Sequence, residues 1–191
     1  MKPEEKWLER MGLIAALVEK APGQTLGRTA IMKLAYFLQV LKKAPLGYRF
    51  GLEIYGPFDS DVLDDLRYAR FFGAVKERTV TQAQGYRFEI KPGKRCAEVQ
   101  KAAKAWLDQN QDALDWVVQE FGALKAPDLE LWSTIIFVDR DNHQQGKSVS
   151  LDELAKQVRG IKPRFSQQYI VGKCREARDK GYLQAVSMSE E

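Results

Sequence analysis

The fold is decided by the stretch Ile31-Met32-Lys33-Leu34-Ala35-Tyr36-Phe37-Leu38, taken together with Glu53-Ile54-Tyr55-Gly56-Pro57-Phe58-Asp59-Ser60 further along the chain. Apolar residues at helical spacing in the first stretch predict an amphipathic helix. The second predicts a strand that ends at Gly-Pro, followed by another helix. Residues 48–54 alternate between apolar and polar side chains, which is typical of a strand. The order helix, strand, helix predicts a winged helix-turn-helix.

The surrounding residues extend this pattern. A first helix is expected from Pro3 to the Pro22-Gly23 break, and a second from a cap at Thr25 to about residue 43. The third helix begins with Asp59 or Ser60 as its cap and ends at Gly73. Residues 74–80 and 86–90 then predict a hairpin, which is the wing. The sequence from residue 91 to 95, Lys-Pro-Gly-Lys-Arg, is the best candidate for a boundary.

The second half of the chain predicts helices almost throughout. We expect one long helix over residues 96–121, an apolar helix over 129–138, a polar loop over 139–148, two further helices and a last strand over 182–186. Pro57-Phe58-Asp59-Ser60 and Pro163-Arg164-Phe165-Ser166 both precede a helix that ends at glycine. This echo makes residues 151–183 a candidate second helix-turn-helix.

The predicted fold class is therefore mainly α (α+β). Residues 1–93 form a winged-helix-like unit and residues 94–191 a helical unit, within one compact domain.

Composition sets the broad class. The chain has 191 residues, of which 45% are hydrophobic and 29% charged, as in an ordinary globular protein. The longest apolar run, residues 11–18, is too short to cross a bilayer and has no features of a signal peptide. Cys96 and Cys174 are far apart in the sequence, which predicts reduced thiols. We therefore expect a cytoplasmic protein with no membrane partner.

Charge is distributed unevenly. Residues 53–66 contain five acidic residues and no basic one, whereas residues 156–180 contain eight basic and two acidic residues. In a DNA-binding winged helix the third helix enters the major groove. Here that helix begins with acidic residues, which the DNA phosphates would repel. Sequence reading of DNA by this helix is therefore disfavoured.

Enzymatic motifs are incomplete. Gly146-Lys147-Ser148 resembles the end of a phosphate-binding loop, but Asp141 stands where that loop needs glycine. The loop around Asp139 lacks the glycine of a calcium site, and the only histidine, His143, has no nearby Ser or Cys in a strained turn. Glu89-Ile90-Lys91 matches the last part of a magnesium nuclease site without the preceding acid. We predict no enzyme, no metal, no cofactor and no small-molecule substrate.

A family resemblance adds to this interpretation. Its motifs are Lys33-Leu34-Ala35-Tyr36-Phe37-Leu38, Glu53-Ile54-Tyr55-Gly56-Pro57 with Ser60, Gly73-Ala74-Val75, Lys162-Pro163-Arg164-Phe165-Ser166 and Gly181-Tyr182-Leu183. Together they resemble the core of the bacterial YwgA-like proteins and the related Panacea (SocA-like) antitoxin domains. A YwgA-like domain forms the C-terminal half of DarG antitoxins, where it binds and blocks a DNA-modifying ADP-ribosyltransferase toxin. The macrodomain of those proteins is absent from this sequence, so its hydrolase activity is not implied.

The resemblance and the charge distribution together suggest a toxin-binding surface that mimics DNA. Carboxylates would take the place of phosphates and aromatic rings the place of bases. The candidate partner-binding residues are Glu53, Tyr55, Phe58, Asp59, Asp61, Asp64, Asp65, Lys33 and Tyr36.

The alternative is a nucleic-acid-binding regulator. Its predicted contacts are Lys162, Arg164, Lys173, Arg175 and Arg178, with Lys76, Arg78 and Arg87 of the wing assisting.

Overall fold

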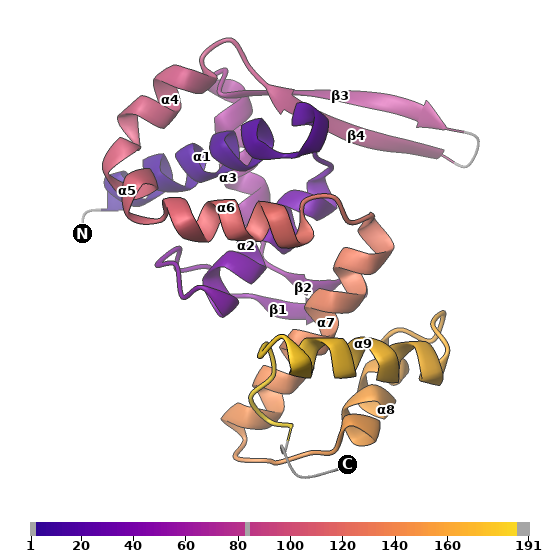
Figure 1. The fold of residues 1–191 in the computed structure, drawn as a ribbon. Helices are drawn as coiled ribbons and strands as arrows, with labels where there is room; N and C mark the ends of the chain where they lie inside the picture. Colours follow the sequence, from indigo (N-terminus) through magenta and orange to yellow (C-terminus); the bar gives the residue numbers. More distant parts are fainter. Residues whose placement is uncertain (1–2, 83–84, 187–191) are drawn as a thin grey trace. The chain divides into compact units, whose positions relative to one another are not determined.

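The computed structural model describes residues 3–82 and 85–186, and these are mainly helical (Figure 1). They form two compact units. Unit 1 contains the chain up to Phe50 together with Asp59–Leu129, and unit 2 contains Gly51–Phe58 together with the residues from Glu130 onward. The chain thus leaves unit 1 for a short hairpin and then returns. This division differs from the expected boundary near residue 93.

Unit 1 contains most of the helices and one two-stranded sheet. Its elements are α1 (Pro3–Lys20), the short 3₁₀ helix η1 (Pro22–Gln24), α2 (Arg28–Leu41), α3 (Ser60–Phe71), β3 (Val75–Gln82), β4 (Gly85–Pro92), α4 (Cys96–Ala102), α5 (Lys104–Gln109), α6 (Gln111–Phe121) and the start of α7 (Ala126–Gln144).

The core of unit 1 surrounds α1 and α2. Residues 11–18 of α1 and 31–38 of α2 are all buried, so both helices are covered on nearly every side. From α6, Phe121 stacks on Phe37 with the ring centroids 4.0 Å apart. Because α6 packs on α2 and α4 packs on α1, the helices after residue 93 share the core of the helices before it. This packing explains why no boundary falls at residue 93.

The predicted hairpin is confirmed. Strands β3 and β4 pair antiparallel, with Val75 opposite Pro92 and Gln82 opposite Gly85. Leu26, just before α2, exchanges two backbone hydrogen bonds with Ile90 of β4, at 3.0 and 2.8 Å. The base of the hairpin is thereby attached to the helical core.

Two expectations in unit 1 were wrong. The N-cap of α2 is Gly27, two residues after Thr25, and the Thr25 hydroxyl donates to the Gly23 carbonyl oxygen. Residues 96–121 form three helices and not one. The first break falls at Ala103, where α1 approaches so closely that a Cβ added to Gly12 would lie 2.3 Å from the Ala103 Cβ. The chain therefore bends around α1 at this point, and α4 does not continue as one straight helix.

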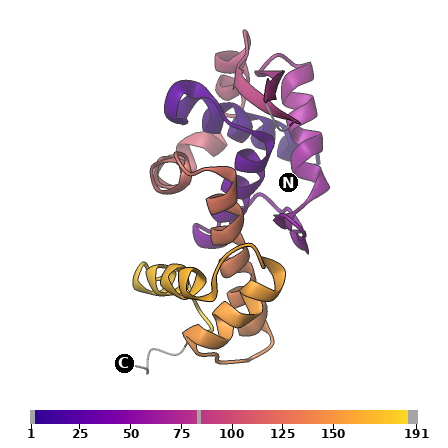
Figure 2. The ribbon, with the colours of Figure 1, turned by 90° about the vertical axis from the view of Figure 1, so that its right-hand side faces the viewer.

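Unit 2 contains β1 (Gly51–Glu53), β2 (Gly56–Phe58), the rest of α7, α8 (Leu151–Ile161) and α9 (Gln167–Asp179). Helices α8 and α9 pack against each other, as the orange and yellow ribbons of Figure 2 show. A complete capping box between Ser150 and Glu153 starts α8, and the Ser166 hydroxyl caps α9. The two helices of the candidate second helix-turn-helix are therefore present, with a five-residue connection from Lys162 to Ser166.

Three further expectations are corrected in unit 2. The strand expected over residues 48–54 covers only Gly51–Glu53, and it pairs with the unexpected strand β2. The loop expected from residue 139 is helical as far as Gln144. Asp139 is fully buried there, where its carboxylate accepts hydrogen bonds from the backbone N–H groups of residues 184 and 185. The backbone N–H groups of residues 184 and 185 are therefore not available for a strand over 182–186. The predicted strand is reduced to a single β-bridge between Val149 and Val186.

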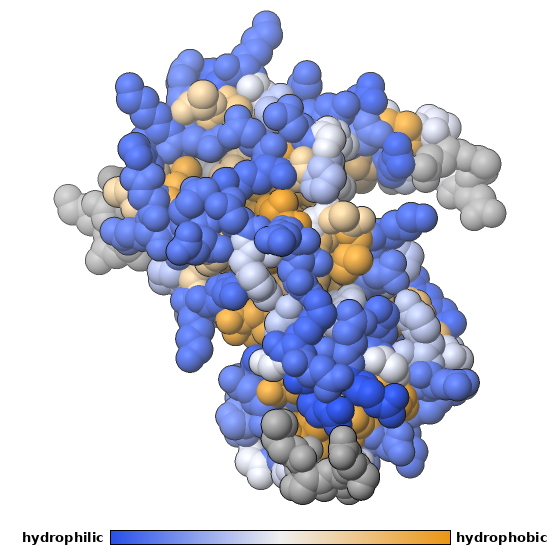
Figure 3. All heavy atoms as spheres, viewed as in Figure 1, coloured by the Kyte–Doolittle hydropathy of each residue, from blue (hydrophilic) through white to orange (hydrophobic). Residues whose placement is uncertain are grey.

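Most of the surface drawn in Figure 3 is hydrophilic, with separate apolar patches. Across residues 3–82 and 85–186, the helices are all too short or too polar to cross a membrane.

Candidate protein-binding site

Helix α3 follows the Gly-Pro segment, and its first carboxylate is used for capping. Asp59 is the N-cap, and its side chain accepts a 2.9 Å hydrogen bond from the backbone N–H of Asp61. It also accepts a hydrogen bond from the backbone N–H of Arg49. Both interactions fix the direction in which α3 leaves the preceding chain. The role of Asp59 is therefore to position the helix.

Asp65 lies in the interior of unit 1 and is only 5% exposed. The Tyr48 hydroxyl donates to its carboxylate at 2.9 Å, and the Arg10 guanidinium approaches at 3.4 Å. Burial raises the pKa of Asp65 to about 6, an effect that the hydrogen bond from Tyr48 and the charge of Arg10 partly offset. Burial and the adjacent Asp65 also raise the pKa of Tyr48. Asp65 thus joins α1, α3 and the segment after α2 and does not face solvent.

One face of α3 exposes two acidic and two aromatic residues, and the basic residues Arg67 and Arg70 are exposed beside it. The Asp61 and Asp64 side chains are 60% and 51% exposed. Tyr68 is 45% exposed and Phe71 81% exposed. Since residues three and four apart lie on one face of a helix, these four side chains form a single row, here called the α3 stripe. Tyr68 and Phe71 were missed at the sequence level, although the spacing 61, 64, 68, 71 was visible there.

The carboxylates of the α3 stripe have basic neighbours. Asp61 lies 3.7 Å from the Arg10 guanidinium, and Asp64 lies 3.2 Å from that of Arg67. The Asp64–Arg67 pair is exposed on both sides and contributes little to stability, because water screens it, whereas Asp61 is the exposed partner of the largely buried Arg10. The Asp64 carboxylate can therefore exchange partners at low cost.

Lys33 and Tyr36, two further predicted contact residues, are core residues of unit 1. Each is 2% exposed, and the Tyr36 ring meets the edge of the Phe50 ring with the centroids 5.1 Å apart. Their positions on α2 give them packing roles, and their side chains are not on the surface.

The remaining predicted contacts lie on the β1–β2 hairpin of unit 2. Its tip exposes 79% of Ile54 and 66% of Tyr55. Glu53 is also exposed, whereas Phe58 is half-buried. Gly56 has φ +89°, and a Cβ there would lie 2.9 Å from Thr134 Oγ1, so glycine allows the hairpin to pack directly on α7.

A lysine fixes the hairpin tip. Lys162 is 3% exposed, and its ammonium donates to the Ile54 carbonyl oxygen at 2.7 Å. It also lies 3.5 Å from a Glu130 carboxylate oxygen, which accepts a 2.8 Å hydrogen bond from Arg164. Burial lowers the pKa of Lys162, while Glu130 opposes the shift. The motifs 53–57 and 162–166 therefore meet in one structural cluster of unit 2.

The other predicted nucleic-acid contacts have acidic partners in most cases. Lys173 pairs with Glu176 at 2.8 Å, and Arg178 pairs with Asp179 at 2.9 Å, while Arg175 is exposed on α9. The basic cluster of the sequence is thus partly neutralised within unit 2.

On the β3–β4 hairpin, Lys76 is exposed, and Arg78 and Arg87 both pair with Glu89, at 2.6 and 2.7 Å. Hydrogen bonds from the two arginines lower the pKa of the Glu89 carboxyl, with Arg78 making the largest contribution. The Glu89 carboxylate is therefore already paired with two arginines.

Within the described parts of the chain, no group of His, Cys, Asp and Glu side chains is arranged to hold a metal ion. Compared with known proteins, the chain matches no family model and no curated protein. Two surfaces remain as candidates for binding a partner, the α3 stripe of unit 1 and the hairpin tip of unit 2.

Proposed function

We propose that this chain is a non-enzymatic, antitoxin-type protein that binds and inhibits a DNA-modifying toxin of the DarT-like ADP-ribosyltransferase class. The observation that carries the proposal is the α3 stripe. Two exposed carboxylates, Asp61 and Asp64, are followed on the same helix face by two exposed aromatic rings, Tyr68 and Phe71. Large exposed aromatic side chains are typical of surfaces that bind another protein.

The order of these side chains suits a surface that imitates nucleic acid. A toxin that modifies DNA needs cationic side chains for the phosphates and flat surfaces for the bases. The carboxylates of Asp61 and Asp64 offer negative charge to the former, and Tyr68 and Phe71 offer rings to the latter. The helix is held rigidly by the Asp59 cap and by its buried face, so little ordering is needed on binding.

The hairpin tip provides a second contact. Ile54 and Tyr55 are exposed, and the Lys162 hydrogen bond and the close packing at Gly56 hold the backbone beneath them. The residues that hold the hairpin belong to the motifs that resemble YwgA-like proteins, and this supports the assignment to antitoxin-type proteins. Tyr55, an exposed aromatic residue on a fixed hairpin, resembles the aromatic anchor residues of strong interfaces.

Binding kinetics test the proposal. A purified DarT-like toxin is immobilised, and association is measured for the wild type and for Asp61→Lys/Asp64→Lys. Loss of complementary charge is expected to slow association and to weaken its dependence on salt. Asp108→Lys, which changes another exposed acid paired to a lysine on α5, is the control. Equal rates for the stripe variant and the wild type would exclude the stripe as the binding surface.

A second candidate is a winged-helix nucleic-acid-binding regulator. It is favoured by the order α1, Leu26, α2, α3, β3, β4, in which Leu26 bonds to Ile90 and so gives the hairpin a third extended partner. This order resembles that of a winged helix, with Leu26 in place of the strand predicted over residues 48–54. A DNA affinity that falls steeply with salt, and is reduced by Arg78→Gln on the wing, would favour this candidate.

A further inference from the structure

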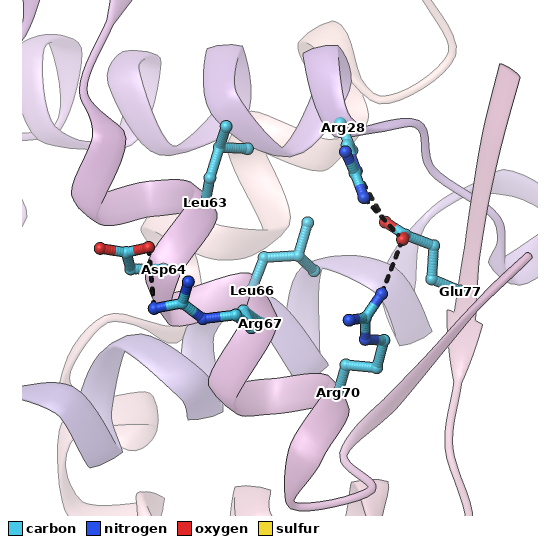
Figure 4. A pocket seen from close by; sticks show the side chains of 7 residues that line it. All are labelled: Arg28, Leu63, Asp64, Leu66, Arg67, Arg70 and Glu77. Carbon is cyan, nitrogen blue, oxygen red and sulfur yellow. Dashed lines mark hydrogen bonds and ion pairs between the residues drawn. The ribbon is translucent and has the colours of Figure 1, made fainter.

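A small pocket of unit 1 lies among three arginines. Its volume is about 170 Å³, and it is bounded by α2, α3 and β3. Figure 4 shows Arg67 and Arg70 projecting from α3 and Arg28 from the start of α2, with the side chains of two leucines between them. Three guanidinium groups face two carboxylates, those of Glu77 and Asp64. The pocket therefore has a net charge of one positive unit.

Glu77 fixes two of the arginines. Its side chain is only 7% exposed, and it accepts hydrogen bonds from Arg28 at 2.8 and 2.7 Å and from Arg70 at 3.0 Å. These arginines lower the pKa of the Glu77 carboxyl, chiefly through the hydrogen bonds from Arg28. The Arg28 guanidinium also lies 3.6 Å from the centre of the Phe88 ring. Both cations are held in place before any ligand arrives, which reduces the entropy lost on binding.

Spare hydrogen-bond donors remain in the pocket. A guanidinium has five N–H donors, and Arg70 uses one nitrogen on Glu77. Arg67 is 62% exposed; it forms a weak, exposed ion pair with Asp64, and its guanidinium lies 5.7 Å from the centre of the Tyr68 ring. A stronger anion can replace that pair. Leu63 and Leu66 form an apolar floor, which limits the water that competes for these donors.

We infer that this pocket binds a phosphate group, with Arg67 and Arg70 donating to its oxygens and Arg28 supplying positive charge behind them. Planar guanidinium forks match the oxygen spacing of phosphate, and arginine is over-represented where proteins bind phosphate through two hydrogen bonds. The volume suits one such group, whether it belongs to a small phosphorylated molecule or to a nucleic-acid backbone. The pocket adjoins the α3 stripe, since Asp64 belongs to both, but phosphate binding is measured without any toxin and is therefore tested independently of the inhibition proposed above.

The test uses the full chain and inorganic phosphate as the probe. Amide NMR spectra are recorded during a phosphate titration, with chloride keeping the ionic strength constant. The amide chemical shifts of Leu63, Leu66 and Arg67 are expected to change with phosphate concentration and to reach a plateau. Arg67→Gln is expected to weaken the phosphate affinity by about tenfold or more, because one charge-assisted interaction is lost. Its control is Arg95→Gln, an equally exposed arginine in an i,i+3 pair with Glu98, which should leave the affinity unchanged.

A short DNA duplex then distinguishes the sources of the phosphate. If the duplex displaces inorganic phosphate and Arg67→Gln weakens both ligands, the group belongs to a nucleic-acid backbone. If phosphate binds at the pocket and the duplex does not displace it, the ligand is a small phosphorylated molecule. Both results support the site. Shifts that do not saturate, or equal weakening by Arg67→Gln and Arg95→Gln, would overturn it.

Discussion

Replacing Lys162 by methionine removes the ammonium that holds the hairpin tip and keeps a side chain of similar length. The lost interaction is the 2.7 Å hydrogen bond to the Ile54 carbonyl oxygen. A hydrogen bond from a charged group contributes about 1.5–3 kcal/mol. Glu130 is not left without a partner, because Arg164 still donates to it at 2.8 Å. We therefore expect a loss of about 2 kcal/mol in the free energy of unfolding, below the ~3–5 kcal/mol expected when a buried charge is left unpaired.

Urea denaturation measures this loss, and amide hydrogen exchange shows where it acts. Faster exchange is expected in residues 51–58, where the hairpin depends on Lys162, and unchanged exchange is expected in α2. Lys156→Met, at an exposed position on α8, is the matched control and should change stability by less than about 0.5 kcal/mol. A Lys162→Met protein as stable as this control, with unchanged exchange in the hairpin, would refute the assigned role.

Three other changes test separate features of the structure. Gly56→Ala should destabilise the protein by about 1–3 kcal/mol, since φ is +89° and the added Cβ would meet Thr134. Thermal denaturation measures this, and Gly146→Ala, with φ +69° and open space around the added Cβ, should cost less. Because burial raises the folded-state pKa of Asp65 to about 6, the folded protein binds the proton more tightly than the unfolded chain, so its contribution to stability is greatest below about pH 4 and is lost as the pH rises through 6. Asp65→Asn should abolish this component in denaturation curves recorded from pH 4 to 7.5, and an identical pH dependence in both proteins would contradict the assignment. Phe71→Ala should weaken toxin binding by about tenfold or more without loss of stability, since the ring is 81% exposed; calorimetry with the purified toxin measures it, and unchanged affinity would count against the α3 stripe.

Local sequence signals predicted much of the secondary structure. The buried run of α2, the end of α3 at Gly73 and the β3–β4 hairpin all follow from periodicity, capping and turn residues. The errors come from interactions between distant residues. No local signal at residue 103 ends a helix, and the break between α4 and α5 falls where Ala103 lies against Gly12 of α1. Likewise, residues 139–144 are polar enough for a loop, but α7 continues to Gln144, and its buried Asp139 accepts hydrogen bonds from the backbone N–H groups of residues 184 and 185.

The candidate site was predictable only in part. The sequence indicated that acidic residues cluster near α3, but it could not show which are exposed. Asp65 is buried because Tyr48 and Arg10 supply partners to it, and Asp59 serves as a cap. Lys162 appeared as part of a basic surface, whereas it is enclosed with Glu130 in unit 2. Such pairings depend on tertiary contacts between residues distant in sequence.

Inhibition of DNA modification tests the central proposal most directly. DNA ADP-ribosylation by a purified DarT-like toxin is followed while the chain is added in increasing amounts. We predict that activity falls to background near equal molar amounts, that Asp61→Lys/Asp64→Lys restores it, and that Asp108→Lys does not. Full toxin activity in the presence of excess wild-type chain, or equal inhibition by the wild type and the stripe variant, would contradict the proposal.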